Sequence, residues 1–129
     1  VQTCALPILV LHSNAPATIL RNESRNDHHW VQLELRGVKT NRDGVGARVK
    51  LVAGDLVQYD EVHSGRGYQS HFGTRLHFGL ARHDRVDRIE VHWSGGGAEL
   101  FEDLPVDRLL TLTERGGRGE AEVHAGKRE

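Results

Sequence analysis

The sequence has few of the residues that tie a small fold together through covalent bonds or metal ions. Cys4 is its one cysteine, so the chain can form neither an internal disulfide nor a cysteine-based zinc site. Aromatic residues account for only 5% of the 129 residues, and apolar residues for 37%. A chain of this length is expected to form one domain, and this composition favours a thin core built on β-sheets.

Neither the charged residues nor the hydrophobic residues cluster in one part of the sequence. The 17 basic and 18 acidic residues are interspersed, with a formal net charge of -1, so we expect no binding of nucleic acid or of a membrane surface. No apolar run approaches the roughly 20 residues of a membrane-spanning helix, so we expect no membrane insertion. The first residues, VQTCALPILVLH, lack the basic region and cleavage site of a signal peptide. Because the chain does not begin with Met, we expect it to be a fragment.

The most informative stretch that is present covers residues 39–49, KTNRDGVGARV. It separates two runs, 31–35 and 47–51, in which apolar and polar residues alternate. Its turn-forming residues are Asn41, Asp43, Gly44 and Gly46. Glycine tolerates positive φ, and Asn and Asp bond their own backbone. The stretch is therefore predicted to be a tight, internally hydrogen-bonded turn that sets the register of the flanking strands.

Short segments of this alternating kind follow one another through most of the chain. They cover residues 30–35, 47–53, 56–63, 75–80, 86–93, 98–101 and 109–112. Gly54-Asp55, between two of them, is typical of a hairpin, and no segment has a helical period over the length of a helix. The pattern predicts an all-β fold, an antiparallel β-sandwich of about seven short strands.

The alternation also predicts which side chains face the core. They are Val31, Leu33, Leu35, Ala47, Val49, Leu51, Ala53, Leu76, Phe78, Leu80, Ile89, Val91 and Trp93. We divide the chain into an N-terminal segment 1–29, which ends in a polar linker, and a β domain 30–114. The glycine-rich, charged residues 115–129 are expected to be a disordered tail.

The residues Asn41-x-Asp43-Gly44 resemble half of a calcium-binding loop, in which alternate oxygen ligands precede a glycine. The carboxylate expected at the twelfth position is missing, because Val52 stands there. We therefore interpret the motif as a structural turn and expect no metal or cofactor. In the alternative, Asn41 and Asp43 are weak ligands of a calcium site that a neighbouring domain completes.

Nine histidines suggest a second kind of metal site. His63, His77 and His92 fall on separate predicted strands at outward-facing positions, where a histidine is normally solvated. In the alternative the three converge, and a tetrahedral Zn²⁺ site would then need one further ligand or a water molecule.

Asp60, His63, Ser64 and Ser70 lie close together in the sequence, which suggests a hydrolytic site. Along one strand, however, successive side chains point to opposite faces, whereas a Ser-His-Asp triad needs its groups within hydrogen-bonding range. The GxSxG motif of a nucleophilic serine is also absent. We expect no enzymatic activity; the alternative is a carbohydrate-active or other hydrolytic domain that uses Asp60 and Glu61.

The loop 64–73, SGRGYQSHFG, is the candidate for contact with a partner. It presents Arg66, Tyr68 and Phe72 among small residues, and Arg and Tyr are enriched at binding hot spots. In the alternative, Tyr68 or Phe72 folds back and covers one end of the sandwich.

Several of these segments together resemble the ASPIC/UnbV family. KTNRDGVGARV is similar to the family's SNRDGIGARV signature, with Thr40 in place of Ser. HSGRGYQS resembles its SGGGYLSQ loop, and RLHFGL resembles its LHFGLG strand. VDRIEVHWSGG resembles its VDRIEVRWPSG strand and turn, with Ser94 in place of the usual Pro, and LPVDRLLTLTE fits its closing strand. The resemblance runs from Asn14 to Glu114.

The resemblance implies a non-catalytic β-rich module that follows β-propeller (FG-GAP/VCBS) repeats in secreted or cell-surface proteins such as the cartilage acidic protein family. It implies that residues 1–29 contain the remnant of such a repeat and that the adjacent repeats are partners of the domain. It further implies a role in protein or glycan binding, outside the cell or in the periplasm. A third interpretation is a purely structural cap on the last propeller blade.

Overall fold

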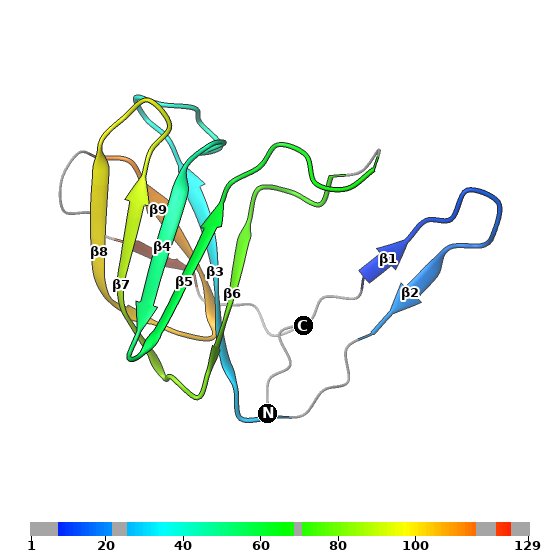
Figure 1. The fold of residues 1–129 in the computed structure, drawn as a ribbon, viewed down its shortest axis with the longest axis horizontal. Helices are drawn as coiled ribbons and strands as arrows, with labels where there is room; N and C mark the ends of the chain where they lie inside the picture. The colour runs from blue at the N-terminus through cyan, green and yellow to red at the C-terminus, as the bar shows by residue number, and fades with distance from the viewer. Residues whose placement is uncertain (1–7, 22–25, 69–70, 116–120, 125–129) are drawn as a thin grey trace.

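The computed structural model describes residues 8–21, 26–68, 71–115 and 121–124. Within these residues the regular elements are ten β-strands, and there is no helix (Figure 1). Eight of these strands form two sheets that face each other across a common core, and the other two form a separate ribbon. The predicted all-β sandwich is confirmed.

The chain passes back and forth between the two sheets, and most consecutive strands that stay in one sheet form hairpins. One sheet has the order β10 (Ala121–His124), β9 (Arg108–Thr113), β3 (His29–Arg36), β6 (Leu76–Ala81). The facing sheet has the order β5 (Leu56–Glu61), β4 (Arg48–Ala53), β7 (Arg85–His92), β8 (Ala98–Pro105). The separate ribbon pairs β1 (Ile8–Val10) with β2 (Thr18–Leu20).

The described strand pairs are antiparallel except for β3 and β9, which run parallel from Val31↔Arg108 to Arg36↔Thr113. The parallel pair arises because the chain returns from β8 in the opposite sheet and enters β9 beside the start of β3. The Asp107 N–H donates to the Trp30 carbonyl over 2.7 Å at this entry, and the Asp107 carboxylate accepts from His29 Nδ1, also over 2.7 Å. These two hydrogen bonds fix the register of β9 against β3.

The core consists of the inward faces of both sheets. Every side chain predicted to face inward is buried, and none of them is more than 4% exposed. Trp93, predicted in phase with Ile89 and Val91, lies with them in the core. The β4–β5 hairpin closes at the predicted Gly54-Asp55, where Gly54 has a φ of 58°. Positive φ at the first loop residue is the geometry of a type II′ hairpin turn, which favours glycine.

Two expectations about the C-terminal part were wrong. The strand expected to end at Phe101 continues to Pro105, past Asp103, whose φ is 61°. Proline is tolerated there because β8 lies at a sheet edge, where a missing N–H breaks no ladder bond. The tail assigned to 115–129 includes β10, which pairs with β9; residues 116–120 and 125–129 of that assignment lie outside the described residues.

The turn between β3 and β4 has the internal hydrogen bonds predicted from its sequence. The Asn41 carbonyl accepts from Gly44 N over 2.9 Å, and the Asn41 side chain accepts from Asp43 N over 3.0 Å. Gly44 has a φ of 66°, and a Cβ on it would lie 2.7 Å from the Leu35 Cβ. Glycine at this position therefore allows the turn to pack directly against the core strand β3.

Glu114, which follows β9, holds the first half of the same turn. Its Oε2 accepts hydrogen bonds from Val38 N, Lys39 N, Thr40 N and the Thr40 hydroxyl, at 2.8, 2.8, 2.9 and 2.9 Å. The Glu114 N–H in turn donates to the Arg36 carbonyl over 2.8 Å, and the residue is only 4% exposed. One buried carboxylate oxygen thus satisfies four donors of a loop 74 to 76 positions earlier in the sequence.

These hydrogen bonds also set the acidity of the carboxyl group. Burial raises the pKa of Glu114, but the hydrogen bonds from the Thr40, Val38 and Lys39 backbone and the Thr40 hydroxyl outweigh it and lower the pKa to about 2. The group is therefore ionised at neutral pH.

We predict that Glu114→Ala lowers the free energy of unfolding by about 3 kcal/mol, because four backbone and hydroxyl donors lose a charged acceptor. Urea unfolding at pH 7 measures the change. Asp84→Ala, at an exposed position between β6 and β7, is the control and should change stability by less than about 0.5 kcal/mol. An equal effect of the two substitutions would contradict the role of Glu114.

We also predict a specific loss of stability in acid. Since the folded-state pKa of Glu114 lies near 2 and its ordinary value is 4.5, its contribution is present above pH 4.5 and is lost as the pH falls toward 2. Glu114→Gln is neutral throughout, so its unfolding free energy should fall less steeply between these pH values. Parallel slopes for the two proteins, measured by urea unfolding at each pH, would exclude this contribution.

Candidate functional site

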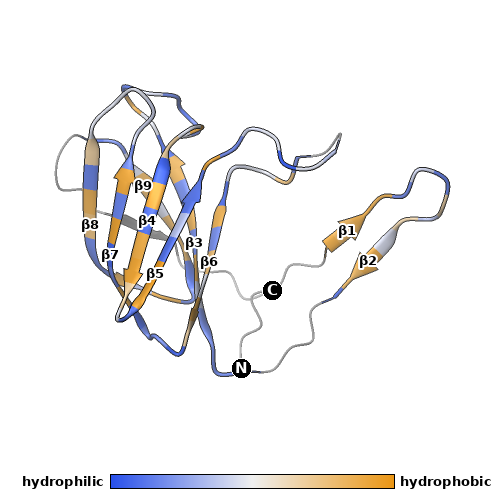
Figure 2. Cartoon of the chain, viewed as in Figure 1, coloured by the Kyte–Doolittle hydropathy of each residue, from blue (hydrophilic) through white to orange (hydrophobic). Residues whose placement is uncertain are grey.

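The β1–β2 ribbon exposes an unusual number of large aliphatic side chains. The exposed fractions are 61% for Ile8, 60% for Leu9, 77% for Leu11, 70% for Ile19 and 52% for Leu20. Figure 2 shows the ribbon as a hydrophobic element that projects away from the sandwich. An isolated two-stranded ribbon is at best marginally stable in water, and clustered exposed apolar groups mark interaction sites.

Both faces of this ribbon are apolar. Leu9 lies opposite Ile19 in the register, and Ile8 lies opposite Leu20. Neighbouring positions of a strand point to opposite faces, so these two pairs occupy different sides of the ribbon. Strands that are apolar on both sides are typical of a sheet covered on both faces, as in a larger assembly.

The loop between β5 and β6 carries the residues predicted to contact a partner. Tyr68 is 89% exposed and Phe72 is 71% exposed, so neither ring folds back on the sandwich. In Figure 1 the loop projects from the β5–β6 side of the sandwich, the same side as the ribbon. The role of Tyr68 and Phe72 in partner binding stays a prediction.

Arg66 has a different position from these two rings. Its Nη2 donates to the Asp60 carboxylate over 2.7 Å and to the Glu61 carbonyl over 2.8 Å. The guanidinium group therefore fastens the start of the loop to the end of β5. Sequence reasoning missed this role, although Asp60 stands only six positions before Arg66.

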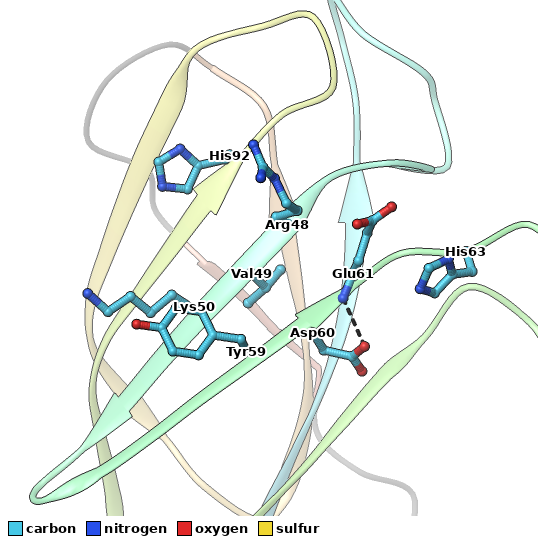
Figure 3. A pocket seen from close by; sticks show the side chains of 8 residues that line it. All are labelled: Arg48, Val49, Lys50, Tyr59, Asp60, Glu61, His63 and His92. Carbon is cyan, nitrogen blue, oxygen red and sulfur yellow. Dashed lines mark hydrogen bonds between the residues drawn. The ribbon is translucent and has the colours of Figure 1, made fainter.

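A shallow groove of about 520 Å³ crosses the outer face of the second sheet (Figure 3). It is lined by Arg48, Val49, Lys50, Tyr59, Asp60, Glu61, His63 and His92. Arg48 on β4 pairs in register with His92 on β7 and with Glu61 on β5, which gives one row of polar side chains. Lys50 pairs with Tyr59 and Glu90, which gives a second row next to the first.

The histidines do not converge. His63 and His92 line the groove, whereas His77 lies on β6 in the other sheet and stacks on Trp30, with ring centroids 5.9 Å apart. Partial burial lowers the pKa of His77, which is neutral at pH 7 as a result. In the part of the chain that the structure describes, no group of three or more His, Cys, Asp or Glu side chains could hold a metal ion.

The weak calcium candidates lie in the β3–β4 turn. The side-chain oxygen of Asn41 already accepts from the backbone N–H groups of Asp43 and Val45, at 3.0 and 3.4 Å. This geometry is that of an Asx-type turn, in which the side chain replaces a backbone acceptor. The Asp43 side chain is exposed.

Asp60 and Glu61, the carboxylates considered for hydrolysis, make different contacts. Asp60 accepts from Arg66 and from its neighbour's N–H, the Glu61 N–H at 2.8 Å, so two donors occupy one of its oxygens. Glu61 lies beside Arg48 in the groove. Ser64 is exposed in the loop, and Ser70 lies outside the described residues.

Comparison with known proteins decides the family. The model of the family described as ASPIC and UnbV matches residues 37–119, which is more than half of the chain. The chain belongs to the ASPIC/UnbV family. The matched region includes the β3–β4 turn and the Glu114 carboxylate that it surrounds, and it excludes the β1–β2 ribbon. No curated protein and no solved structure matches the chain significantly. Among the described residues, no helix of this ASPIC/UnbV protein could span a membrane.

We predict that Arg66→Ala loosens the loop that carries Tyr68 and Phe72. Loss of the Asp60 contact should lower the free energy of opening the loop by about 1 kcal/mol, which raises the population of the open loop roughly fivefold. Limited proteolysis with chymotrypsin, which cleaves after Tyr and Phe, measures the opening and should be faster by that factor. Arg42→Ala, in an exposed part of the β3–β4 turn, is the control; equal cleavage rates in both variants would contradict the fastening role.

Proposed function

We propose that this ASPIC/UnbV domain is a non-catalytic accessory module that packs against β-propeller repeats and supports protein or glycan binding. The observation that carries the proposal is the β1–β2 ribbon, whose large aliphatic side chains are 52 to 77% exposed on both faces. Such a ribbon requires a neighbour that covers it, and strand pairing plus apolar contact is how a preceding repeat would do so. The repeats themselves are an expectation from the family.

The loop tip supports the same proposal. Tyr68 and Phe72 are exposed, and Arg66 fastens the start of their loop to the end of β5. A loop that is held at its base loses less entropy when it becomes ordered on binding. Because the loop and the ribbon project on the same side, one neighbour could contact both (Figure 1). We place the module outside the cell or in the periplasm, where the repeats of this family are expected.

The geometry gives less support to the hydrolytic alternative with Asp60 and Glu61. A glycoside-cleaving pair needs two carboxyl groups that face one bond, one of them able to hold a proton. Here the Arg66 guanidinium holds Asp60, and adjacent strand positions direct the two side chains to opposite faces.

The first test is the reading frame upstream of the codon for Val1. FG-GAP/VCBS repeats and a secretion signal there support the proposal, and a catalytic domain there would overturn it. The repeats, expressed as a separate chain, then provide the probe for binding to the 129-residue chain.

We predict that replacing both Leu9 and Ile19 by Ser weakens association with those repeats by at least about tenfold, because each buried aliphatic side chain contributes on the order of 1.5–3 kcal/mol. Titration calorimetry measures the affinity. Val38→Ser removes an exposed valine from the β3–β4 turn and should leave the affinity unchanged. Undiminished binding by the double variant would show that the ribbon is not the docking element, and a chain that is insoluble without the repeats would favour the structural cap.

A further inference from the structure

We propose that the groove on the outer face of β7, β4 and β5 is a binding site for an uncharged saccharide. This inference deepens the glycan part of the proposed function and rests on it. The groove lies on the sheet face, and its lining includes neither residues of the ribbon nor Tyr68 and Phe72. It is therefore a separate site from the docking surface.

The central observation concerns Arg48 and Glu61. The two residues are direct cross-strand neighbours, and side chains at such positions lie close enough to interact. Yet within the described residues neither side chain forms an ion pair, although other opposite charges on the same sheet face do so, such as Lys50 with Glu90 at 3.6 Å. A cationic donor and an anionic acceptor therefore stand on either side of the groove with their hydrogen-bonding capacity unused (Figure 3).

A sugar hydroxyl matches this pair chemically. Each hydroxyl both donates and accepts, so neighbouring hydroxyls of one ring can accept from the Arg48 guanidinium and donate to the Glu61 carboxylate. Hydrogen bonds that involve an ionised partner are stronger than neutral ones, and the planar guanidinium can address two acceptors at once. The exposed His92 next to Arg48 extends the row with a further donor or acceptor.

Tyr59 supplies the apolar part of the site. It is 71% exposed, so its ring is accessible to a ligand in the groove. The Lys50 Nζ lies 6.0 Å from the ring centroid, and Lys50 is itself held toward Glu90, so the ring has a neighbour that restricts it. An exposed aromatic face with a hydroxyl tip suits the apolar C–H face of a pyranose ring.

The charge balance selects an uncharged ligand. Lys50 is paired with Glu90 and Asp60 with Arg66, and Arg48 lies next to Glu61, so the groove has no net charge to attract a polyanion such as a sulfated glycan or a nucleic acid. An apolar peptide would leave the Arg48 and Glu61 charges desolvated without partners, which is costly. The volume of about 520 Å³ lies in the range of small-ligand sites.

The test is binding of neutral oligosaccharides of glucose, galactose, mannose and N-acetylglucosamine to the full chain, measured by titration calorimetry after a glycan-array screen. We expect at least one of these to bind, and Tyr59→Ala and Arg48→Ala each to weaken its binding about tenfold. Glu61→Gln should weaken it less, since the amide keeps one acceptor oxygen. Arg82→Ala, at the opposite end of the sheet in the β6–β7 turn, is the matched control and should bind as the original chain does.

Three results would overturn the inference: no neutral oligosaccharide bound at millimolar concentration, binding of sulfated or sialylated glycans alone, or equal binding by the Tyr59 and Arg82 variants. Thermal unfolding of each variant separates loss of the site from loss of the fold. Association with the propeller repeats, measured on the same variants, should be unaffected by Tyr59→Ala. If the chain associates with the propeller repeats but binds no saccharide, only the assignment of the groove is refuted. If it neither associates with the repeats nor binds a saccharide, the proposed function is refuted as well.

Discussion

The Glu114 carboxylate is the constraint on which the rest of the domain depends. It leaves the central strand β9 and fills the turn that carries the chain from one sheet to the other, so both sheets are tied to one buried charge. The turn after Trp93 approaches the same group, since a Cβ on Gly96 would lie 3.0 Å from the Glu114 Oε1 and 2.8 Å from the Thr40 Cγ2. A buried carboxylate without hydrogen-bond donors would destabilise the fold. Here the N–H groups of the loop donate to it, so the buried charge stabilises the turn. The family signature 39–49 is thus a structural motif built around an acceptor from elsewhere in the chain.

The core and turn residues stabilise the fold, and the groups that we consider for binding lie on the surface. The ribbon offers apolar area, the loop offers two aromatic rings on a fastened base, and the outer sheet face offers a row of polar side chains beside Tyr59. We assign the ribbon and the loop to a neighbouring domain and the polar sheet face to a saccharide, because the two kinds of surface differ in character.

The sequence predicted the core well, because inward and outward residues alternate with the period of a strand and no helical pattern competes. It also predicted the turn at Gly54 and the internal bonds of Asn41. It could not predict Glu114, because a lone acid after an apolar strand carries no local signal and its partners are more than 70 positions away. The contact between Arg66 and Asp60 was missed for a related reason: the residue type of Arg66 suggested contact with a partner and did not indicate that the fold places Asp60 beside it. β10 is hidden in a charged, glycine-rich segment and exists through its pairing with β9.

The parallel pairing of β3 with β9 has a consequence for the order in which the domain can be completed during synthesis. The sheet of β5, β4, β7 and β8 is complete once residue 105 has left the ribosome, whereas β3 must wait for residues 108–113 before its second edge is covered. Pairing over so long a separation is slow, and an uncovered strand edge invites association with other chains. The nascent domain is therefore most vulnerable just before its last core strand arrives, and the closure of Glu114 onto its turn marks the end of that interval.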